Sequence, residues 1–110
     1  MNLSLQLCNK TEKNIESAGI RLWAYFWNID AGKCSDFQKA KWLYERIPLS
    51  FITYTPEGIR ERYESIPIDY FGESLLEAGS YTLNINSLDD SPENATLVHN
   101  NGVQYEIVQN

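Results

Sequence analysis

Short segments in which apolar and polar residues alternate constrain the fold of this chain more than any other feature. Residues 2–8 alternate leucine with polar side chains, and a period of two is typical of a strand with one buried face. Residues 80–86 repeat the pattern, with Tyr81, Leu83 and Ile85 on the apolar side. Polar or glycine-containing turn signals border both segments. The pattern therefore indicates a β-rich protein.

Three further stretches extend this interpretation. Residues 18–29 are apolar at nearly every position and rich in aromatic side chains, which predicts a second, longer strand. Residues 49–55 are rich in β-branched and aromatic residues and also predict a strand. An Asn-Gly step at 101–102 separates 95–99 from 103–108, which predicts a C-terminal β-hairpin. The inward face of its second strand is expected to consist of Val103, Tyr105 and Ile107.

Two segments have a mixed character. Residues 34–42 suit either a strand or a short helix, and the charged residues 58–65 suit one or two helical turns. A chain of 110 residues forms one domain, here 1–110. Strands at short spacing with turns between them predict a mainly β fold, namely a small antiparallel β-sandwich or a partly open barrel with one short helix.

Charge is distributed unevenly along the chain, whose formal net charge is −6. Residues 1–62 carry all nine lysines and arginines with seven acids, whereas 63–110 carry eight acids and no lysine or arginine. A half without these cations projects a negative field unless it folds against the other half. Internal pairing and an acidic surface for a basic partner both remain open. The candidate partner-binding acids of the loop 88–94 are Asp89, Asp90 and Glu93.

The composition also excludes some partners. Direct binding of nucleic acid is not expected, because phosphate recognition uses clustered lysines and arginines. The chain has no run of about eighteen apolar residues, so no membrane-spanning helix is expected. Residues 1–8 lack the basic segment of a signal peptide, which leaves open a cytoplasmic protein and the mature form of an exported one. Nothing in the sequence indicates the oligomeric state.

The residue types used in catalysis form no recognisable motif. The single histidine, His99, is not accompanied by a G-x-S-x-G nucleophile motif. The two cysteines do not form a C-x-x-C pair, and with one histidine they fall short of four zinc ligands. Glycine-rich phosphate loops are absent from the sequence. We therefore expect no enzymatic activity, catalytic residue, metal site or cofactor.

An aromatic stripe within 18–29 is the strongest candidate for a binding surface. Trp23, Tyr25 and Trp27 share one face of the expected strand, whose other face is also apolar. Two apolar faces normally indicate a central strand covered on both sides. The alternative is an exposed platform for a sugar, a peptide or a protein, because tyrosine and tryptophan are enriched at interfaces.

Cys8 and Cys34 bracket this stripe. If the strands at 2–8 and 18–29 pair and the chain folds back after Gly32, the two sulfur atoms can approach each other. A disulfide closing this loop of about 26 residues would stabilise the fold by roughly 3 kcal/mol in the chain-entropy model. The residues alone leave open both this candidate disulfide and two buried free thiols.

The segments CNKT (8–11) and WNIDAGKC (27–34) together resemble the opening of a small bacterial family known as a domain of unknown function. Members of that family open with Cys-Asn-Lys/Arg-Thr and later carry Trp-x-Ile-x-x-Gly-x-Cys. The resemblance covers residues 8–34. It implies an exported, β-rich protein with a disulfide and an extracytoplasmic location, and it implies no activity.

These features favour a non-enzymatic binding module of bacterial or phage origin. Its expected partner is a protein with a basic surface, as for inhibitors, immunity proteins and antagonists, and this step is an analogy. The alternative is an extracytoplasmic β-sandwich that binds a carbohydrate or small ligand through the aromatic face. The two hypotheses use different residues, namely the acids near residue 90 and the stripe near residue 25.

Overall fold

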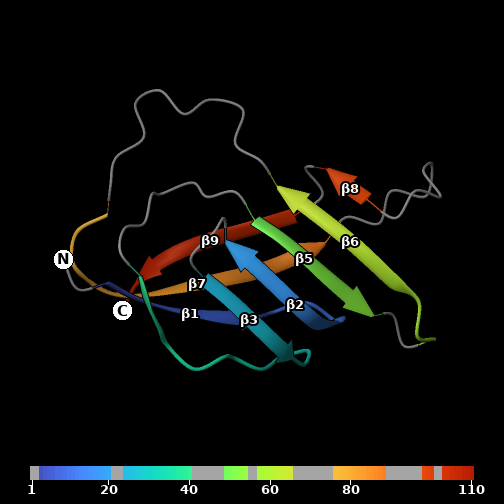
Figure 1. The fold of residues 1–110 in the computed structure, drawn as a ribbon, viewed down its shortest axis with the longest axis horizontal. Helices are drawn as coiled ribbons and strands as arrows, with labels where there is room; N and C mark the ends of the chain where they lie inside the picture. Colours follow the sequence, from blue (N-terminus) through green and yellow to red (C-terminus); the bar gives the residue numbers. More distant parts are fainter. Residues whose placement is uncertain are drawn as a thin grey trace.

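A computed structural model shows two β-sheets packed face to face as a sandwich (Figure 1). The structure describes residues 3–20, 24–40, 49–54, 57–65, 76–88, 98–100 and 103–110. In Figure 1 the strands of one sheet run diagonally across those of the other. The sheets do not close into a barrel, so the sandwich form of the predicted fold is the observed one.

The first sheet, called sheet A, has four strands in the order β4-β1-β7-β9. β1 and β7 run parallel, and the other two pairs are antiparallel. The strands predicted at 2–8 and 80–86 are confirmed as β1 and β7. The four strands are β1 (Leu3–Asn9), β4 (Gln38–Ala40), β7 (Gly79–Leu88) and β9 (Val103–Gln109).

The second sheet, called sheet B, has five strands in the order β3-β2-β5-β6-β8. Among its described strands, β6 and β8 run parallel and the other neighbouring pairs are antiparallel. The strand predicted at 49–55 is confirmed as β5. The five strands are β2 (Asn14–Ile20), β3 (Ala24–Ile29), β5 (Leu49–Tyr54), β6 (Arg60–Ser65) and β8 (Val98–Asn100).

The single long strand expected at 18–29 is wrong. The chain reverses inside this run, and β2 and β3 pair antiparallel with Ile20 opposite Ala24. β3 is the terminal strand of sheet B rather than a central one. The outward side chains of Tyr25 and Trp27 are exposed, so no second layer covers them.

The helical turns expected at 58–65 are also wrong. β6 pairs with β5 along its whole length, from Tyr54 opposite Arg60 to Leu49 opposite Ser65. Tyr63 is fully buried and its ring stacks on Phe51 at 5.2 Å between centroids. Burial of one aromatic ring outweighs the helical preference of the charged residues around it. The described residues contain no helix.

The predicted C-terminal hairpin does not form. β8 pairs with β6 in sheet B, whereas β9 pairs with β7 in sheet A, so the chain crosses between the sheets after Asn100. The expected inward face of β9 is confirmed, because Val103 is buried and Tyr105 and Ile107 pack against the core. For the ambiguous stretch 34–42, the structure shows a short strand at 38–40 and does not describe 41–42.

The core fills the space between the two sheets. Alternation sends every second side chain of the central strands inward, so leucines of β1 meet aromatic and branched side chains of sheet B. Burying an apolar side chain of this size contributes roughly 1.5–3 kcal/mol, which makes this layer the main source of stability. The largest fully buried side chains are Tyr63, Phe26, Phe51, Leu5, Leu7, Ile15, Ile20, Leu49, Leu83 and Ile85.

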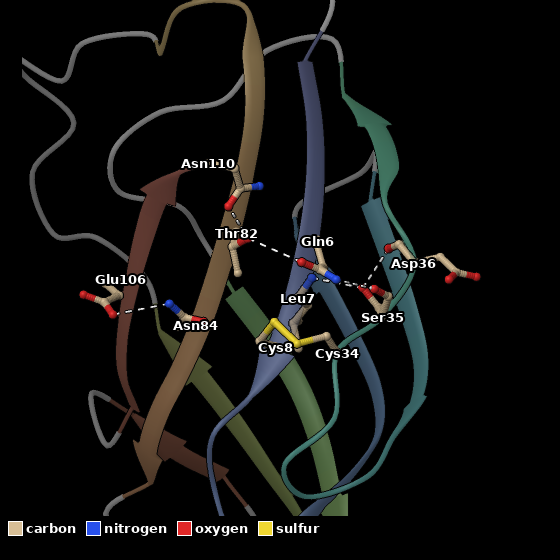
Figure 2. Close-up of a disulfide and its surroundings, with 10 residues drawn as sticks. All are labelled: Gln6, Leu7, Cys8, Cys34, Ser35, Asp36, Thr82, Asn84, Glu106 and Asn110. Carbon is tan, nitrogen blue, oxygen red and sulfur yellow. Dashed lines mark hydrogen bonds between the residues drawn. A yellow bond between two sulfur atoms is a disulfide. The ribbon is translucent and has the colours of Figure 1, made fainter.

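The predicted Cys8–Cys34 disulfide is present (Figure 2). The two residues form an isolated antiparallel bridge with Cα atoms 4.0 Å apart. The flanking bonds Asn9 N–Lys33 O and Ser35 N–Leu7 O measure 2.8 and 2.7 Å, so the cysteines are the closely spaced, non-hydrogen-bonded pair. The strand pairing that was expected to bring the two cysteines together is wrong, because β1 lies in sheet A and does not pair with β2 in sheet B. The bridge instead joins β1 to the segment that leads into β4.

Asn9, next to Cys8, is fully buried and joins this segment to sheet B. Its side-chain Nδ2 donates to the carbonyls of Lys13 and Ile29 at 2.7 and 3.0 Å. Its Oδ1 accepts from both the backbone N–H and the hydroxyl of Thr11, at 3.0 and 2.6 Å. All the hydrogen-bonding capacity of this amide is used, as a buried polar group requires. Asn9 thus fixes the end of β3 against the turn at 10–13.

The turn at 30–33 completes this junction. Lys33 N donates to Asp30 O at 2.9 Å, and Gly32 has a φ of 80°, which a side chain would disfavour. Gly32 N also donates to Asn9 O at 2.8 Å. The residues that carry the family resemblance therefore lie together and have a structural role in this chain.

The outer face of sheet A carries a row of polar side chains (Figure 2). Thr82 donates to Asn110 at 2.8 Å, and Gln6 donates to the Ser35 carbonyl at 3.0 Å. On the neighbouring row Asn84 donates to Glu106 at 3.3 Å. This face satisfies its own polar groups.

Among the described residues, no helix is long and apolar enough to cross a membrane.

Candidate functional site

A groove of about 460 Å³ crosses the outer face of sheet B. Alternation along β3 points Phe26 into the core, where it is 1 % exposed, and points Tyr25 and Trp27 outward. These outward side chains are 48 % and 65 % exposed. Large aromatic side chains normally bury most of their area, so two adjacent exposed ones mark this face as a candidate ligand site.

The groove is built from two rows of side chains that run across four strands. The strand register places Tyr25, Gly19, Ser50 and Glu64 side by side in the first row. The register places Trp27, Ser17, Ile52 and Arg62 side by side in the second row. Each row has an aromatic ring on β3, a small residue on β2 and a charged residue on β6. With strands about 4.8 Å apart, the distance from β3 to β6 is roughly 14 Å.

Small residues on β2 give the groove its depth. Gly19 lies opposite Tyr25, and a Cβ added at Gly19 would lie 3.3 Å from Tyr25 Cε1. The Tyr25 ring therefore packs directly on the backbone of β2. Ser17 is similarly small and lies opposite Trp27. Larger residues here would fill the floor and push the aromatic rings away from the sheet.

The opposite wall is an ion pair on β6. Arg62 Nη2 and Glu64 Oε1 are 2.7 Å apart, and Arg62 is about half exposed. The guanidinium supplies several N–H donors and the carboxylate supplies acceptors, while their charges cancel. This wall suits a ligand that is uncharged and rich in hydroxyl groups. An exposed pair of this kind contributes little to stability.

A break in the alternation sets the direction of the outward residues. β2 has one extra residue relative to β5 between Ile15 and Ser17, which is a β-bulge. In β3, on the other side of β2, Asn28 has a φ of 54°, a left-handed conformation that asparagine tolerates better than most residues. Ile29 therefore points into the core and does not share the outward face of Tyr25 and Trp27.

A second hollow, of about 390 Å³, lies on the other side of Trp27. It lies between the outer edge of β3 and the segment that follows the disulfide, and Trp27 lines both hollows. Asp30, Lys33 and Asp36 are exposed on its walls. The amide of Gln38 donates to the Tyr25 carbonyl at this edge. The backbone edge of β3 is therefore partly capped.

A partly buried polar cluster lies outside the groove, between the turn at 10–13 and β6. Lys13 Nζ is 2.7 Å from Glu61 Oε2 and donates to the Tyr63 hydroxyl at 2.9 Å. The Tyr63 hydroxyl donates to Glu61 at 2.8 Å. Burial raises the pKa of Tyr63 well above its ordinary value, the hydrogen bond from Lys13 lowers the pKa, and the hydrogen bond to Glu61 raises it further. This cluster holds the turn against the sheet.

Of the predicted partner-binding residues, some line the groove and the others lie outside the described residues. Tyr25 and Trp27 line the groove. Four predicted site residues lie outside the described residues, namely Trp23, Asp89, Asp90 and Glu93. His99 lies in β8. The sequence interpretation missed Gly19, Ser17, Arg62 and Glu64. Reading 58–65 as a strand would have placed Arg62 and Glu64 on one outward face.

Comparison of the chain with protein-family models, with curated protein sequences and with solved structures finds no match. The groove is therefore the feature of this chain that bears on its function.

Proposed function

We propose that this chain is a non-enzymatic binding module and that the groove on the outer face of sheet B holds a carbohydrate. The observation that carries the proposal is the composition of the two rows, which end in Tyr25 and Trp27 on one side and in an Arg–Glu pair on the other. Aromatic rings offer a flat apolar surface for the C–H face of a sugar. The ion pair offers donors and acceptors for hydroxyl groups.

The groove matches the general form of a small-ligand site, in which apolar walls are combined with a few polar groups of fixed position. Its ion pair adds no net charge, so an uncharged ligand meets no unpaired charge on this wall. A peptide that added a strand to β3 would need the backbone carbonyls of that edge. The Tyr25 carbonyl already accepts a hydrogen bond from Gln38, which disfavours strand addition there.

Binding of neutral oligosaccharides tests this proposal. We would titrate the disulfide-intact protein with cello-, xylo-, manno- and chito-oligosaccharides and follow tryptophan fluorescence and heat. Trp27→Ala and Tyr25→Ala are expected to weaken binding by about tenfold or more, as for central aromatic residues of binding sites. Phe37→Ala is the matched control, because Phe37 is 49 % exposed and lines neither hollow. Absence of binding across the four series would contradict the proposal.

A basic protein partner is the second candidate, as expected from the acidic half of the sequence. Within the described part of 63–110, Glu77 and Glu106 are exposed and form no ion pair with a described cation. Affinity purification tests this candidate with the wild-type chain and with Asp89→Asn/Asp90→Asn/Glu93→Gln. A protein retained only by the wild type, and released by salt, would support it. Equal retention by both chains would count against the acidic loop.

We further infer an extracytoplasmic location, because disulfides such as Cys8–Cys34 persist in oxidising compartments. Alkylation of free thiols in intact cells, before lysis, tests the inference. Complete protection of both cysteines is expected. Two alkylated cysteines would place the chain in a reducing compartment instead.

A further inference from the structure

We infer that the ligand is a chain of several sugar units that passes over Trp27 and occupies both hollows at the β3 edge of the sandwich. This inference rests on the proposed function, and it specifies the length and path of the ligand. Trp27 lines the groove on one side and the second hollow on the other. Its side chain, 65 % exposed, stands between the two hollows as a shared wall.

The direction of the two rows supports this path. Both rows run perpendicular to the strands, from β6 through β5 and β2 to β3. A line continued past β3 reaches the segment that leads into β4, where the second hollow lies. The groove alone measures roughly 14 Å from β3 to β6 at ordinary strand spacing. A ligand longer than the groove that follows this line therefore reaches the second hollow.

The second hollow offers the groups that a further sugar unit would use. Lys33 supplies N–H donors, and Asp30 and Asp36 supply carboxylate acceptors. The disulfide and the turn at 30–33 hold the backbone that carries these side chains. The hollow is therefore held in place by covalent and hydrogen-bonded constraints, and a ligand meets a surface that is already ordered.

The chemistry of the two hollows differs in a way that can be measured. The groove combines aromatic rings with a compensated ion pair, whereas the second hollow is lined mainly by charged and polar side chains. Stacking in the groove is expected to provide most of the affinity, and the second hollow is expected to add affinity for longer chains. Chain-length dependence is therefore the property that separates one hollow from two.

The test compares disaccharides with hexasaccharides of the same four series. In the series that binds, the hexasaccharide is expected to bind at least about tenfold more tightly than the disaccharide. The variant Lys33→Ala/Asp36→Ala is expected to weaken hexasaccharide binding several-fold and to leave disaccharide binding unchanged. Its control is Lys39→Ala/Glu106→Ala, because these exposed residues belong to sheet A and the double change also preserves net charge.

The outcomes distinguish this inference from the proposal beneath it. If disaccharides bind in a way that depends on Trp27 and hexasaccharides bind no more tightly, the groove remains the proposed site. The inference that the ligand also occupies the second hollow is then overturned. Equal loss for both ligand lengths in Lys33→Ala/Asp36→Ala would also overturn it. Absence of binding by every oligosaccharide would overturn both the carbohydrate proposal and the path. Unchanged circular dichroism in each variant confirms that the fold is intact.

Discussion

The ring of Tyr25 lies across the backbone of Gly19 on the neighbouring strand, and a Cβ added at Gly19 would lie 3.3 Å from Tyr25 Cε1. A Cβ at that distance would force the ring to move by a few tenths of an ångström. The pairing of an aromatic ring with a glycine across two strands also covers backbone that a glycine leaves exposed. The position of the Tyr25 ring therefore depends on a residue with no side chain.

Gly19→Ala is the first prediction that follows from this contact. We expect weaker ligand binding, because the methyl group lifts the Tyr25 ring away from the floor of the groove. The free energy of unfolding should change by less than about 1 kcal/mol, since alanine also restricts the unfolded chain. Ser4→Ala is the control, because Ser4 lies on β1 in sheet A and does not line the groove. Oligosaccharide titration and urea unfolding measure the two effects, and unchanged affinity would contradict the contact.

Removal of the disulfide gives the second prediction. Cys8→Ala/Cys34→Ala should lower the free energy of unfolding by roughly 3 kcal/mol, because the bridge closes a loop with a sequence separation of 26. The chain should remain folded, since the backbone hydrogen bonds Asn9 N–Lys33 O and Ser35 N–Leu7 O join the same segments. Urea unfolding with and without reductant measures the loss. The double variant has no disulfide, so reductant should not shift its urea-unfolding midpoint. A shift would show that the loss of stability does not come from the bridge alone.

The conformation of Asn28 gives the third prediction. Its φ of 54° lies in the left-handed region, where a β-branched side chain is strongly disfavoured. Asn28→Val should cost about 1–2 kcal/mol of stability and disturb the inward direction of Ile29. Asn28→Gly should leave stability nearly unchanged, because glycine adopts this conformation readily. Equal midpoints for the two variants in urea unfolding would show that the residue has another conformation in solution.

Local alternation predicted the strands whose two faces differ. Residues 2–8 and 80–86 have one apolar and one polar face, so their period of two was visible in the sequence and became β1 and β7. The run 18–29 was apolar on both faces and contained no turn signal at its point of reversal. A hairpin inside a continuous apolar run depends on which residues pair, for example Ile20 with Ala24.

The C-terminal segments show a different limit. The Asn-Gly step at 101–102 correctly marked a break between two strands, and Val103 was correctly expected to point inward. No local pattern indicates which sheet each of these strands joins. β8 pairs with β6 and β9 pairs with β7, and both pairings join segments that are distant in the sequence. A local turn signal cannot distinguish a hairpin from a crossing between sheets.

Only the aromatic side of the candidate site could be predicted from the sequence. Tyr25 and Trp27 stood out as an aromatic stripe, whereas Arg62 and Glu64 lie far away in sequence and become neighbours through β2 and β5. The charged segment around Tyr63 looked helical because arginine and glutamate favour helices in isolation. Its strand conformation comes from the burial of Tyr63 against Phe51, which is a tertiary effect.

The buried Tyr63 hydroxyl gives the last prediction, which concerns pH. Burial raises the pKa of Tyr63 in the folded chain, so the folded state holds this proton to higher pH than the unfolded state does. The stabilisation is therefore complete below the unfolded pKa of about 10 and declines as pH rises above it. Tyr63→Phe keeps the ring stacked on Phe51 and should flatten the decline, at a cost of about 1 kcal/mol at neutral pH for the lost hydrogen bonds to Lys13 and Glu61. Urea unfolding from pH 8 to 11 measures the effect with the exposed Tyr25→Phe as control, and an equally steep decline in Tyr63→Phe and the wild type would show that other groups cause it.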